Sequence, residues 1–114
     1  MPDDCIFCKI RTGKIKSEIL YQDGTCFVVR DITPRAPTHL LVIPNRHFTH
    51  LSNLMPSHSV PVGSMVEVAE EMARREGIVE SGYRLVVNQG DDSGQQVPHL
   101  HLHLLGGGRL GEMA

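Results

Sequence analysis

The sequence carries little net charge, no long apolar run and few cysteines. Its 114 residues contain 11 Lys and Arg against 13 Asp and Glu, which gives a formal net charge of -2 with His neutral. The sequence therefore lacks the excess of positive charge that is typical of a nucleic-acid-binding protein. No run of Lys or Arg marks a membrane-binding surface. No apolar stretch approaches the roughly 20 residues that a membrane span needs. We therefore expect neither a nucleic acid nor a membrane as a partner.

The N-terminus also lacks the features of a secretory signal. Its opening, MPDDCIFCKI, has acidic residues where a signal peptide has basic ones, and no apolar core segment follows. The three cysteines, Cys5, Cys8 and Cys26, cannot all pair within one chain. Both observations favour a reducing compartment with free or metal-bound thiols, so we expect a cytoplasmic protein.

What is present is an ordinary globular composition at the size of one domain. Hydrophobic residues make up 40% of the chain and charged residues 21%, which argues against a disordered protein. No internal repeat and no low-complexity linker divides the sequence. We therefore expect residues 1–114 to form a single domain with one core.

The apolar pattern predicts an α+β fold with a mainly antiparallel sheet of about five strands. Short stretches rich in β-branched or aromatic residues, separated by turn residues, predict strands at 18–23, 25–32, 39–44, 83–89 and 98–105. Tight turns between neighbouring strands favour antiparallel pairing.

Two helices complete the predicted fold. Residues 5–14 predict a short helix that Asp3 or Asp4 caps and that ends at Gly13. Residues 60–77 place apolar side chains at helical spacing and predict one long amphipathic helix ending at Gly77. Its start is predicted near Ser57, Ser59 and Pro61, the last of which a first turn tolerates.

Three of the seven histidines alternate in VPHLHLHLLGGG, residues 97–108. Side chains at i, i+2 and i+4 of a strand share one face, so His99, His101 and His103 lie together. The intervening leucines face the other side, where we expect them to pack against the long helix. Three interpretations of the histidine face are open: a solvated polar surface, a shared metal, or nucleophilic catalysis.

Catalysis explains the alternation best. A solvated strand face normally carries Thr, Lys or Glu, and the outer two histidines lie about 13 Å apart along a strand, too far to share one ion. Neutral imidazole is a good nucleophile, because its reference pKa is about 6.5. Attack through Nε2 requires an acceptor for Nδ1–H, which a neighbouring backbone carbonyl supplies for the middle residue. We therefore predict His101 as the nucleophile, with flanking imidazoles that move protons or bind the leaving group.

The residues around these histidines resemble one known family. QQVPHLHLHLL resembles the signature of the histidine triad (HIT) superfamily, His-x-His-x-His followed by apolar positions. DITPRAPTHLLVIPNRH resembles that family's segment with nucleotide-sugar contacts and a further active-site histidine. GYRLVVNQG resembles the strand and turn before the triad, and CIFCKI the N-terminus of many microbial members. The resemblance spans nearly the whole chain, with only residues 52–80 generic.

The resemblance implies a HIT-type fold and a nucleotide hydrolase. In that family the middle histidine attacks the α-phosphate of a nucleotide conjugate, and water then releases a nucleoside monophosphate from the nucleotidyl-histidine. On this basis His101 is the nucleophile, with His39 and His103 as the supporting relay. Asn88 matches a residue that contacts the phosphate, and Asp31 the carboxylate that binds ribose hydroxyls. From the residues alone, Asp31 and Asn88 are equally well explained as turn residues.

The loop at 90–96, GDDSGQQ, is ambiguous. Gly90 and Gly94 allow backbone N–H groups to approach a phosphate, whereas Asp91 and Asp92 repel one. A plain hairpin loop is the alternative. Gln96 stands where the phosphoramidase branch of the family often has Ser; since Gln also donates a hydrogen bond, we include it among the nucleotide-binding residues, and expect an altered leaving-group preference.

The Cys5-x-x-Cys8 pair is half of a metal site. A redox CxxC normally follows a strand, and only four residues precede this one. Two unrelated buried thiols are one alternative, and a zinc site completed by histidines is the other. Several microbial triad proteins carry a structural zinc held by CxxC, a later His and the first triad His, which implies the ligands Cys5, Cys8, His47 and His99. Four protein ligands leave no open position, so the ion would be structural. Cys26 is predicted to lie in the core.

Within the family, HLLGGGRLG resembles the purine nucleoside phosphoramidase branch, while dinucleoside polyphosphate hydrolases more often have Pro-Arg there. Gln96 and Pro98 are shared with other bacterial-type members. The phosphoramidase branch often carries a Trp-Pro-Pro-Gly-like tail at the C-terminus. This sequence reads GRLGEMA at that place, so we expect altered substrate choice. A dinucleoside polyphosphate hydrolase and a non-catalytic purine-nucleotide-binding dimer are the alternatives; a purely metal-binding protein has least support.

The family also implies a homodimer built from the long helix and a sheet strand of each subunit. An amphipathic helix that carries Met65, Met72 and several valines suits a core or an interface equally well. The sequence alone does not distinguish the two.

Overall fold

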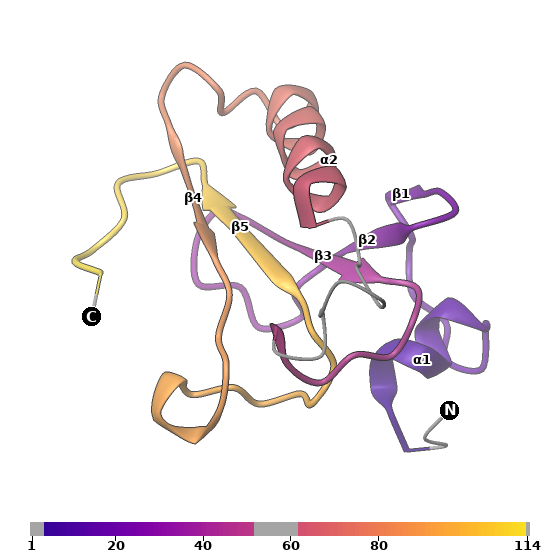
Figure 1. Ribbon diagram of the computed structural model, residues 1–114. Helices are drawn as coiled ribbons and strands as arrows, with labels where there is room; N and C mark the ends of the chain where they lie inside the picture. Colours follow the sequence, from indigo (N-terminus) through magenta and orange to yellow (C-terminus); the bar gives the residue numbers. More distant parts are fainter. Residues whose placement is uncertain (1–3, 52–61, 114) are drawn as a thin grey trace.

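A computed structural model describes residues 4–51 and 62–113 (Figure 1). Five strands form one antiparallel sheet in the order β1-β2-β3-β5-β4. The strands are β1 (Tyr21–Gln22), β2 (Cys26–Arg30), β3 (Thr38–Pro44), β4 (Tyr83–Val86) and β5 (Leu102–Gly106). The helices are α1 (Ile6–Arg11), α2 (Val62–Arg75) and a short 3-10 turn, η3 (Asp91–Ser93). The predicted α+β fold with one long and one short helix is confirmed.

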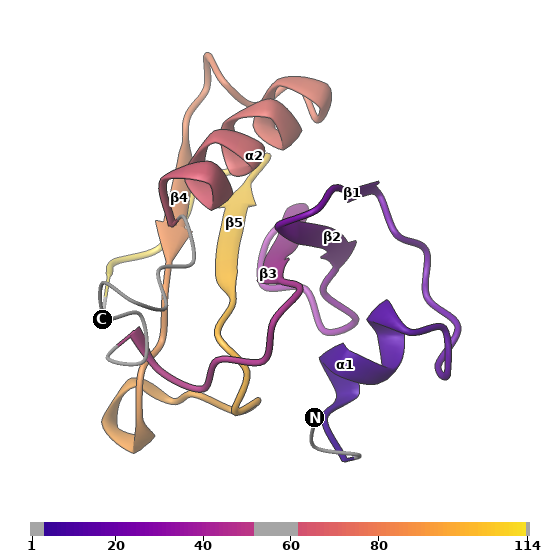
Figure 2. The same ribbon diagram turned by 45° about the vertical axis from the view of Figure 1, so that its right-hand side comes forward.

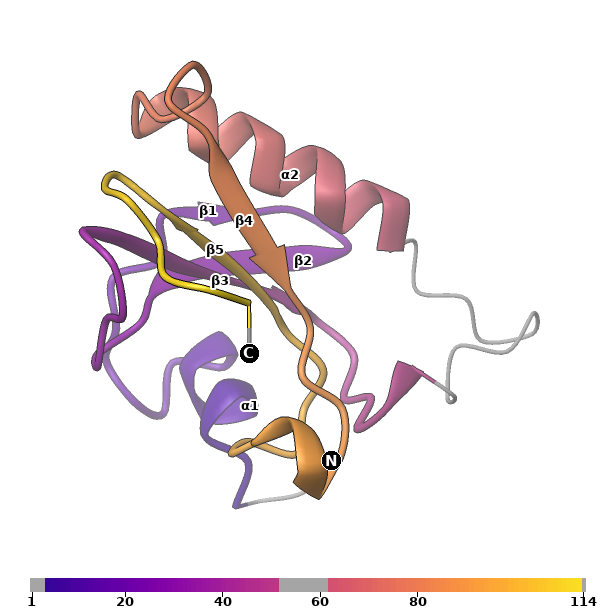
Figure 3. The ribbon, with the colours of Figure 1, turned by 90° about the vertical axis from the view of Figure 1, so that its left-hand side faces the viewer.

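The two helices cover opposite faces of the sheet. Figure 3 shows α2 above the strands and α1 below them, and Figure 2 shows the same separation from another side. Under α2 lies the larger core cluster, which contains Leu40, Val42, Leu102 and Leu104. The smaller cluster lies on the α1 face and includes Phe7 and other side chains from α1, β2 and β3. Because both faces are covered, all seven residues of β3 are buried, as is usual for a central strand.

Pairing between β3 and β5 brings the histidines together. His103 lies opposite Leu41, and His39 is two residues from Leu41 on the same face of β3. The two imidazoles are therefore diagonal neighbours across the pair, within reach of each other. Leu100, Leu102 and Leu104 all join the core cluster under α2, so the predicted division between leucine and histidine faces is confirmed.

Several predicted boundaries differ from the structure. The strand predicted at 18–23 is only Tyr21–Gln22, and β5 begins at Leu102, so His99 and His101 precede the paired strand. The predicted cap of the short helix is wrong for Asp4: Cys5 is the N-cap, because its Sγ accepts the backbone N–H of Cys8. Asp3 lies outside the described residues.

The helix ends match the predictions more closely. Gly13 and Gly77 follow α1 and α2 with φ of 82° and 72°, the left-handed backbone that ends helices at little cost for glycine. The proposed start near Ser57, Ser59 and Pro61 lies outside the described residues. Within the ranges that the structure describes, no helix is long and apolar enough to cross a membrane.

Candidate active site and metal centre

His101 is buried, and its ring is fixed by the chain just before it. Its Nδ1 lies 2.7 Å from the carbonyl oxygen of His99, and a carbonyl can only accept, so Nδ1 carries the proton. The Nε2 atom then holds the lone pair. This is the tautomer that nucleophilic attack through Nε2 requires. Burial lowers the pKa of His101, which keeps the ring neutral near pH 7.

A chain of hydrogen bonds joins the backbone of Arg35, His39 and His103 in the same site. The backbone N–H of Arg35 donates to Nδ1 of His39 at 3.0 Å, so neutral His39 carries its proton on Nε2. That Nε2 lies 2.9 Å from Nδ1 of His103 and 3.4 Å from Oδ2 of Asp31. We call Asp31, His39 and His103 the relay cluster.

This chain of hydrogen bonds leaves the Nε2–H of His103 without a partner among the described residues. Because His103 Nδ1 accepts from His39, neutral His103 carries its proton on Nε2. This Nε2 is buried and has no hydrogen-bond partner among the described residues. An unpaired buried N–H is costly, so the site offers a ready donor to an incoming oxygen or nitrogen. Burial, reinforced by His101 and His39, lowers the pKa of His103 to about 4.

The ring of His101 lies next to that of His103. The centroids of the two rings are 4.9 Å apart, with the planes inclined at 59°. The ring that carries the nucleophilic nitrogen and the ring that carries the N–H donor are therefore neighbours. That pairing is suited to attack on a phosphorus centre with transfer of a proton nearby.

On the α1 side lies a second group of ligating side chains, Cys5, Cys8, His47 and His99, which we call the Cys/His cluster. Nδ1 of His99 lies 3.3 Å from Cys5 Sγ, 3.6 Å from Cys8 Sγ and 3.1 Å from His47 Nδ1. Cys8 Sγ is also 3.4 Å from His47 Nδ1. One potential ligand atom from each side chain faces the same point.

The separations fit a tetrahedral metal site. With bonds near 2.1 Å to nitrogen and 2.3 Å to sulfur, tetrahedral ligand atoms lie about 3.4–3.8 Å apart. Nε2 of His99 lies 2.9 Å from the carbonyl oxygen of Pro44 and donates to it, so Nδ1 keeps its lone pair for the cluster. Burial, then the hydrogen bond and charge of Cys5, raise the pKa of the Cys8 thiol to about 11. A cation supplies the charge that stabilises the thiolates, and the residues therefore fit a metal.

Structure and sequence agree on most placements. The four predicted metal ligands lie together, as do Asp31, His39, His101 and His103. Asp31 also makes a turn, because its Oδ1 accepts the backbone N–H of Thr33 at 2.8 Å. Both explanations of Asp31 that the sequence offers, a site carboxylate and a turn cap, are therefore compatible with its position.

Two predicted nucleotide-binding residues are less closely tied to the site. No hydrogen bond within the described part of the chain joins Asn88 or Gln96 to a site histidine, and Gln96 is exposed. Its neighbour Gln95 instead closes the loop, with Oε1 accepting from the N–H of Gly90 at 2.9 Å and Nε2 donating to the carbonyl of Thr49.

Residues that the sequence analysis did not single out complete both clusters. Arg35 and Pro44 act through the backbone, so their side chains give no signal. Phe7 packs its ring against both His99 and His101, with centroids 5.7 Å and 5.1 Å away. Its place between the two cysteines is the signal that could have identified it.

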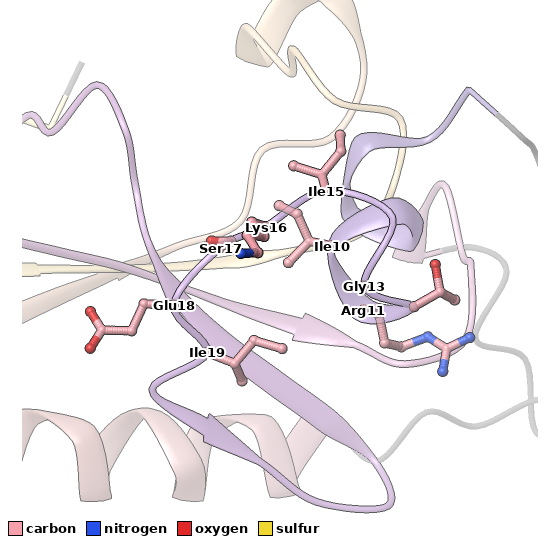
Figure 4. A pocket seen from close by; sticks show the side chains of 9 residues that line it. Ile10, Arg11, Gly13, Ile15, Lys16, Ser17, Glu18 and Ile19 are labelled. Atoms are coloured by element: carbon pink, nitrogen blue, oxygen red, sulfur yellow. The ribbon is translucent and has the colours of Figure 1, made fainter.

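A separate hollow of about 640 Å³ lies beyond the end of α1 (Figure 4). It is lined by residues 10–13 and 15–19, and none of the candidate site residues borders it. The close-up shows side chains from α1 and from the segment that follows it around this hollow. The histidines, and not this hollow, therefore define the candidate active site.

Comparison with known proteins gives the class. The HIT domain family model matches residues 12–110, so the chain belongs to the HIT domain family, which confirms the histidine triad resemblance. The purine nucleoside phosphoramidase of Escherichia coli K12 is 45% identical over 113 residues, covering 99% of this chain and 95% of that protein. Protein HitA of Neisseria gonorrhoeae is 40% identical over 104 residues, covering 91% and 96%.

Solved structures agree. A HIT family hydrolase from Clostridium thermocellum has a TM-score of 0.93 at 38% identity, covering 98% of this chain and 97% of that one. A histidine triad protein from Clostridium difficile also has a TM-score of 0.93, at 36% identity and coverage of 100% and 99%. The sheet and its two helices are therefore those of the HIT fold.

Proposed function

We propose that this chain is a nucleotide hydrolase that cleaves nucleoside 5′-phosphoramidates, or related nucleotide conjugates, at the α-phosphate. One observation carries the proposal: the fixed tautomers leave an Nε2 lone pair on His101 and, on the adjacent ring of His103, an Nε2–H that has no partner among the described residues. The phosphoramidase name of the Escherichia coli relative, 45% identical over nearly the full length, supports this substrate class.

The reaction proceeds in two steps on this arrangement. His101 Nε2 forms a bond to the α-phosphorus while the bond from phosphorus to the leaving nitrogen or oxygen breaks. The leaving atom takes up one proton from solvent, and the water that is split in the second step returns one proton to solvent. His103, with His39 behind it, donates its Nε2–H toward the phosphoryl oxygens or the leaving atom. Water then cleaves the phosphorus–nitrogen bond to His101, releases a nucleoside monophosphate and restores the neutral imidazole.

Three further residues contribute to nucleotide binding in this proposal. Asp31 holds the ribose hydroxyls, while Asn88 and Gln96 contact the phosphate. Asp31 is supported by its place beside His39, at 3.4 Å. The other two lie on the segments that follow β4 and precede the triad.

We propose zinc as the metal of the Cys/His cluster. Two thiolates and two imidazoles are a ligand set that Zn²⁺ prefers, and four protein ligands leave no position for water or substrate. When bound, the ion supplies charge compensation and a cross-link between α1, the segment after β3 and the triad. It takes no part in the chemical steps.

We also propose a homodimer in a reducing compartment. Edge strand β4 is half-buried along its length and pairs, among the described residues, only with β5. Val66 on α2 is 41% exposed, which leaves apolar surface for a partner helix. Cys5, Cys8 and Cys26 are free thiols, as a reducing compartment favours. Light scattering at micromolar concentration tests the dimer: a mass of one chain refutes it.

The function is tested by parallel hydrolysis of adenosine 5′-phosphoramidate and a diadenosine polyphosphate. Wild-type protein is compared with His101→Ala and with His50→Ala, a control at an exposed histidine outside both clusters. We expect faster AMP release from the phosphoramidate, lost in His101→Ala and retained in His50→Ala.

Other outcomes discriminate between the alternatives. A preference for the polyphosphate keeps the chemistry and replaces the substrate class. Nucleotide binding by both wild type and His101→Ala, without turnover of either substrate, identifies a binding protein instead. Activity in His101→Ala refutes the assigned nucleophile.

A further inference from the structure

Two contacts hold the imidazole of His101, and they act on different parts of the ring. The carbonyl of His99 accepts Nδ1–H at 2.7 Å, which fixes one edge. The ring of Phe7 meets the imidazole with centroids 5.1 Å apart and planes at 74°, an edge-to-face contact. A hydrogen bond alone permits the imidazole to tilt about that bond, whereas an aromatic ring packed against it removes this freedom.

Phe7 directs its ring toward two of the triad histidines from within the core of the α1 face. It is 6% exposed and belongs to the core cluster of the α1 face, together with Phe27, Leu41 and Ile43. Its ring also meets His99 edge-to-face, with centroids 5.7 Å apart and planes at 76°. Phe7 therefore packs against the ring of one proposed metal ligand and against the proposed nucleophile.

Both groups that contact His101 are tied to the Cys/His cluster, one by sequence and one by its own side chain. Phe7 lies between Cys5 and Cys8, whose turn is closed by the N–H of Cys8 donating to Cys5 Sγ. His99 supplies the carbonyl through its backbone and a ring nitrogen to the cluster through its side chain. Closing the four ligands together therefore sets the position of both groups that hold His101.

We propose that Phe7 is a positioning residue for the nucleophile, and that a closed Cys/His cluster is what holds Phe7 and the His99 carbonyl against His101. The inference rests on the proposed function for its kinetic consequence and on the proposed metal for its coupling. The cluster does not include the reacting atoms, so in this proposal it acts on the rate through these two contacts.

The expected signature is a lower kcat at nearly constant KM. Misplacement of a reacting group by about 1 Å costs up to about 10²-fold in rate. A nucleophile whose ring tilts more widely binds substrate as before but attacks less often. A residue that only contacted substrate would change KM instead.

The first experiment compares Phe7→Leu with Phe27→Leu. Both changes replace a buried phenylalanine of the same core cluster, but Phe27 makes no ring contact with a histidine among the described residues. For Phe7→Leu we expect full metal content by elemental analysis, KM within about threefold, and kcat reduced about 10- to 100-fold. Phe27→Leu should lose stability and keep its kcat. Equal losses of kcat in the two variants, or a change in KM alone, overturn the proposal.

The second experiment needs no turnover. In protein labelled with ¹⁵N at histidine, the shifts of the two ring nitrogens report the tautomer of His101. With Zn²⁺ bound we expect one tautomer, with the proton on Nδ1. After chelation, below the unfolding midpoint of the chelated protein, we expect a mixture of tautomers at His101 while His39 keeps its own. An unchanged His101 tautomer without metal refutes the coupling.

The two experiments separate the inference from the function on which it rests. If the wild type hydrolyses neither substrate, the proposed function fails, and the spectroscopic experiment still decides whether the cluster holds His101. If the wild type is active and chelation leaves the His101 signals unchanged, the function stands and the inference fails.

Discussion

Two clusters of potential metal ligands lie on the same face of the sheet, and only one has the hydrogen bonding of a metal site. The Cys/His cluster and the relay cluster each gather ligand atoms within 4.8 Å of one another, and each contains one histidine of the triad. They differ in what the remaining ring nitrogens do. In the Cys/His cluster, His99 gives its N–H to the Pro44 carbonyl and turns a lone pair inward. In the relay cluster, His39 accepts the Arg35 N–H on Nδ1, so the nitrogen facing inward carries a proton.

The difference shows that proximity of ligating groups does not define a metal site. A metal on His39 Nε2 would displace its proton and force one onto Nδ1, against the N–H of Arg35. The relay cluster therefore favours proton donation over metal binding. One backbone group in each cluster makes this distinction: the Pro44 carbonyl accepts from His99, and the Arg35 N–H donates to His39.

Loss of the metal is expected to have the largest effect. Cys5→Ser removes a thiolate from the Cys/His cluster, and chelation of the wild type should reproduce it. A site saturated about 1,000-fold above its dissociation constant stabilises the fold by about 4 kcal/mol, so we expect the melting temperature to fall by roughly 15 °C. Calorimetry with and without chelator measures this. A control, Asp31→Asn, should keep its metal; loss of metal there would mean that the relay cluster binds it.

His103→Leu comes next and should change rate without changing metal content. Leucine has no N–H, so the variant lacks the Nε2–H donor beside His101, and loss of one hydrogen-bond donor to a transition state costs about 10²–10³-fold. We expect kcat for the phosphoramidate to fall at least about 100-fold, with the same metal content as the wild type by elemental analysis. A variant with normal kcat would show that the relay does not serve the reaction.

Acid should destabilise the relay cluster in a defined pH window. The pKa of His103 is about 4 in the folded protein, against about 6.5 when unfolded, so between these values only the unfolded chain takes up the proton. The unfolding free energy therefore falls as pH is lowered, by about 2 kcal/mol from this residue between pH 7 and pH 5. Urea unfolding at both pH values measures the fall, and His103→Leu should show a correspondingly smaller one. Equal pH dependence in the two proteins would contradict the low pKa.

Asp31→Asn is expected to have the smallest effect. The amide oxygen still accepts the N–H of Thr33, so the turn is kept while the charge near His39 is lost. We expect kcat/KM to fall about 5- to 10-fold, roughly 1 kcal/mol, with unchanged stability. Asp31→Ala removes the turn contact as well and should lower the melting temperature. Equal stability of the two variants would show that the turn contact contributes nothing.

Local sequence patterns predicted which helices and strands form better than they predicted where each one begins and ends. The helical spacing from Val62 to Arg75 and glycines at 13 and 77 identified the helices, because these signals lie within a few residues of each other. Strand 18–23 was overpredicted: within the described residues Tyr21 and Gln22 pair in register with β2, and the flanking Leu20 and Asp23 add only single backbone hydrogen bonds to it. The short helix is capped by Cys5 because a sulfur, and not a carboxylate, accepts the N–H of Cys8.

The sequence by itself determined which side chains share a face: alternation in PHLHLHLL separates the leucines from the histidines, and CxxC brings two thiols onto one turn. The neighbouring carbonyl that holds His101 was also predicted from the sequence, whereas only the tertiary structure decided what His99 and His103 do. The Pro44 carbonyl fixes the tautomer of His99, and the Arg35 N–H fixes that of His103 through His39; both are backbone atoms distant in sequence from the triad. Every residue except proline carries the same backbone donor and acceptor, so no pattern of side chains predicts which one meets a given imidazole. Sheet pairing between β3 and β5 and the packing of the segments at their ends make that choice.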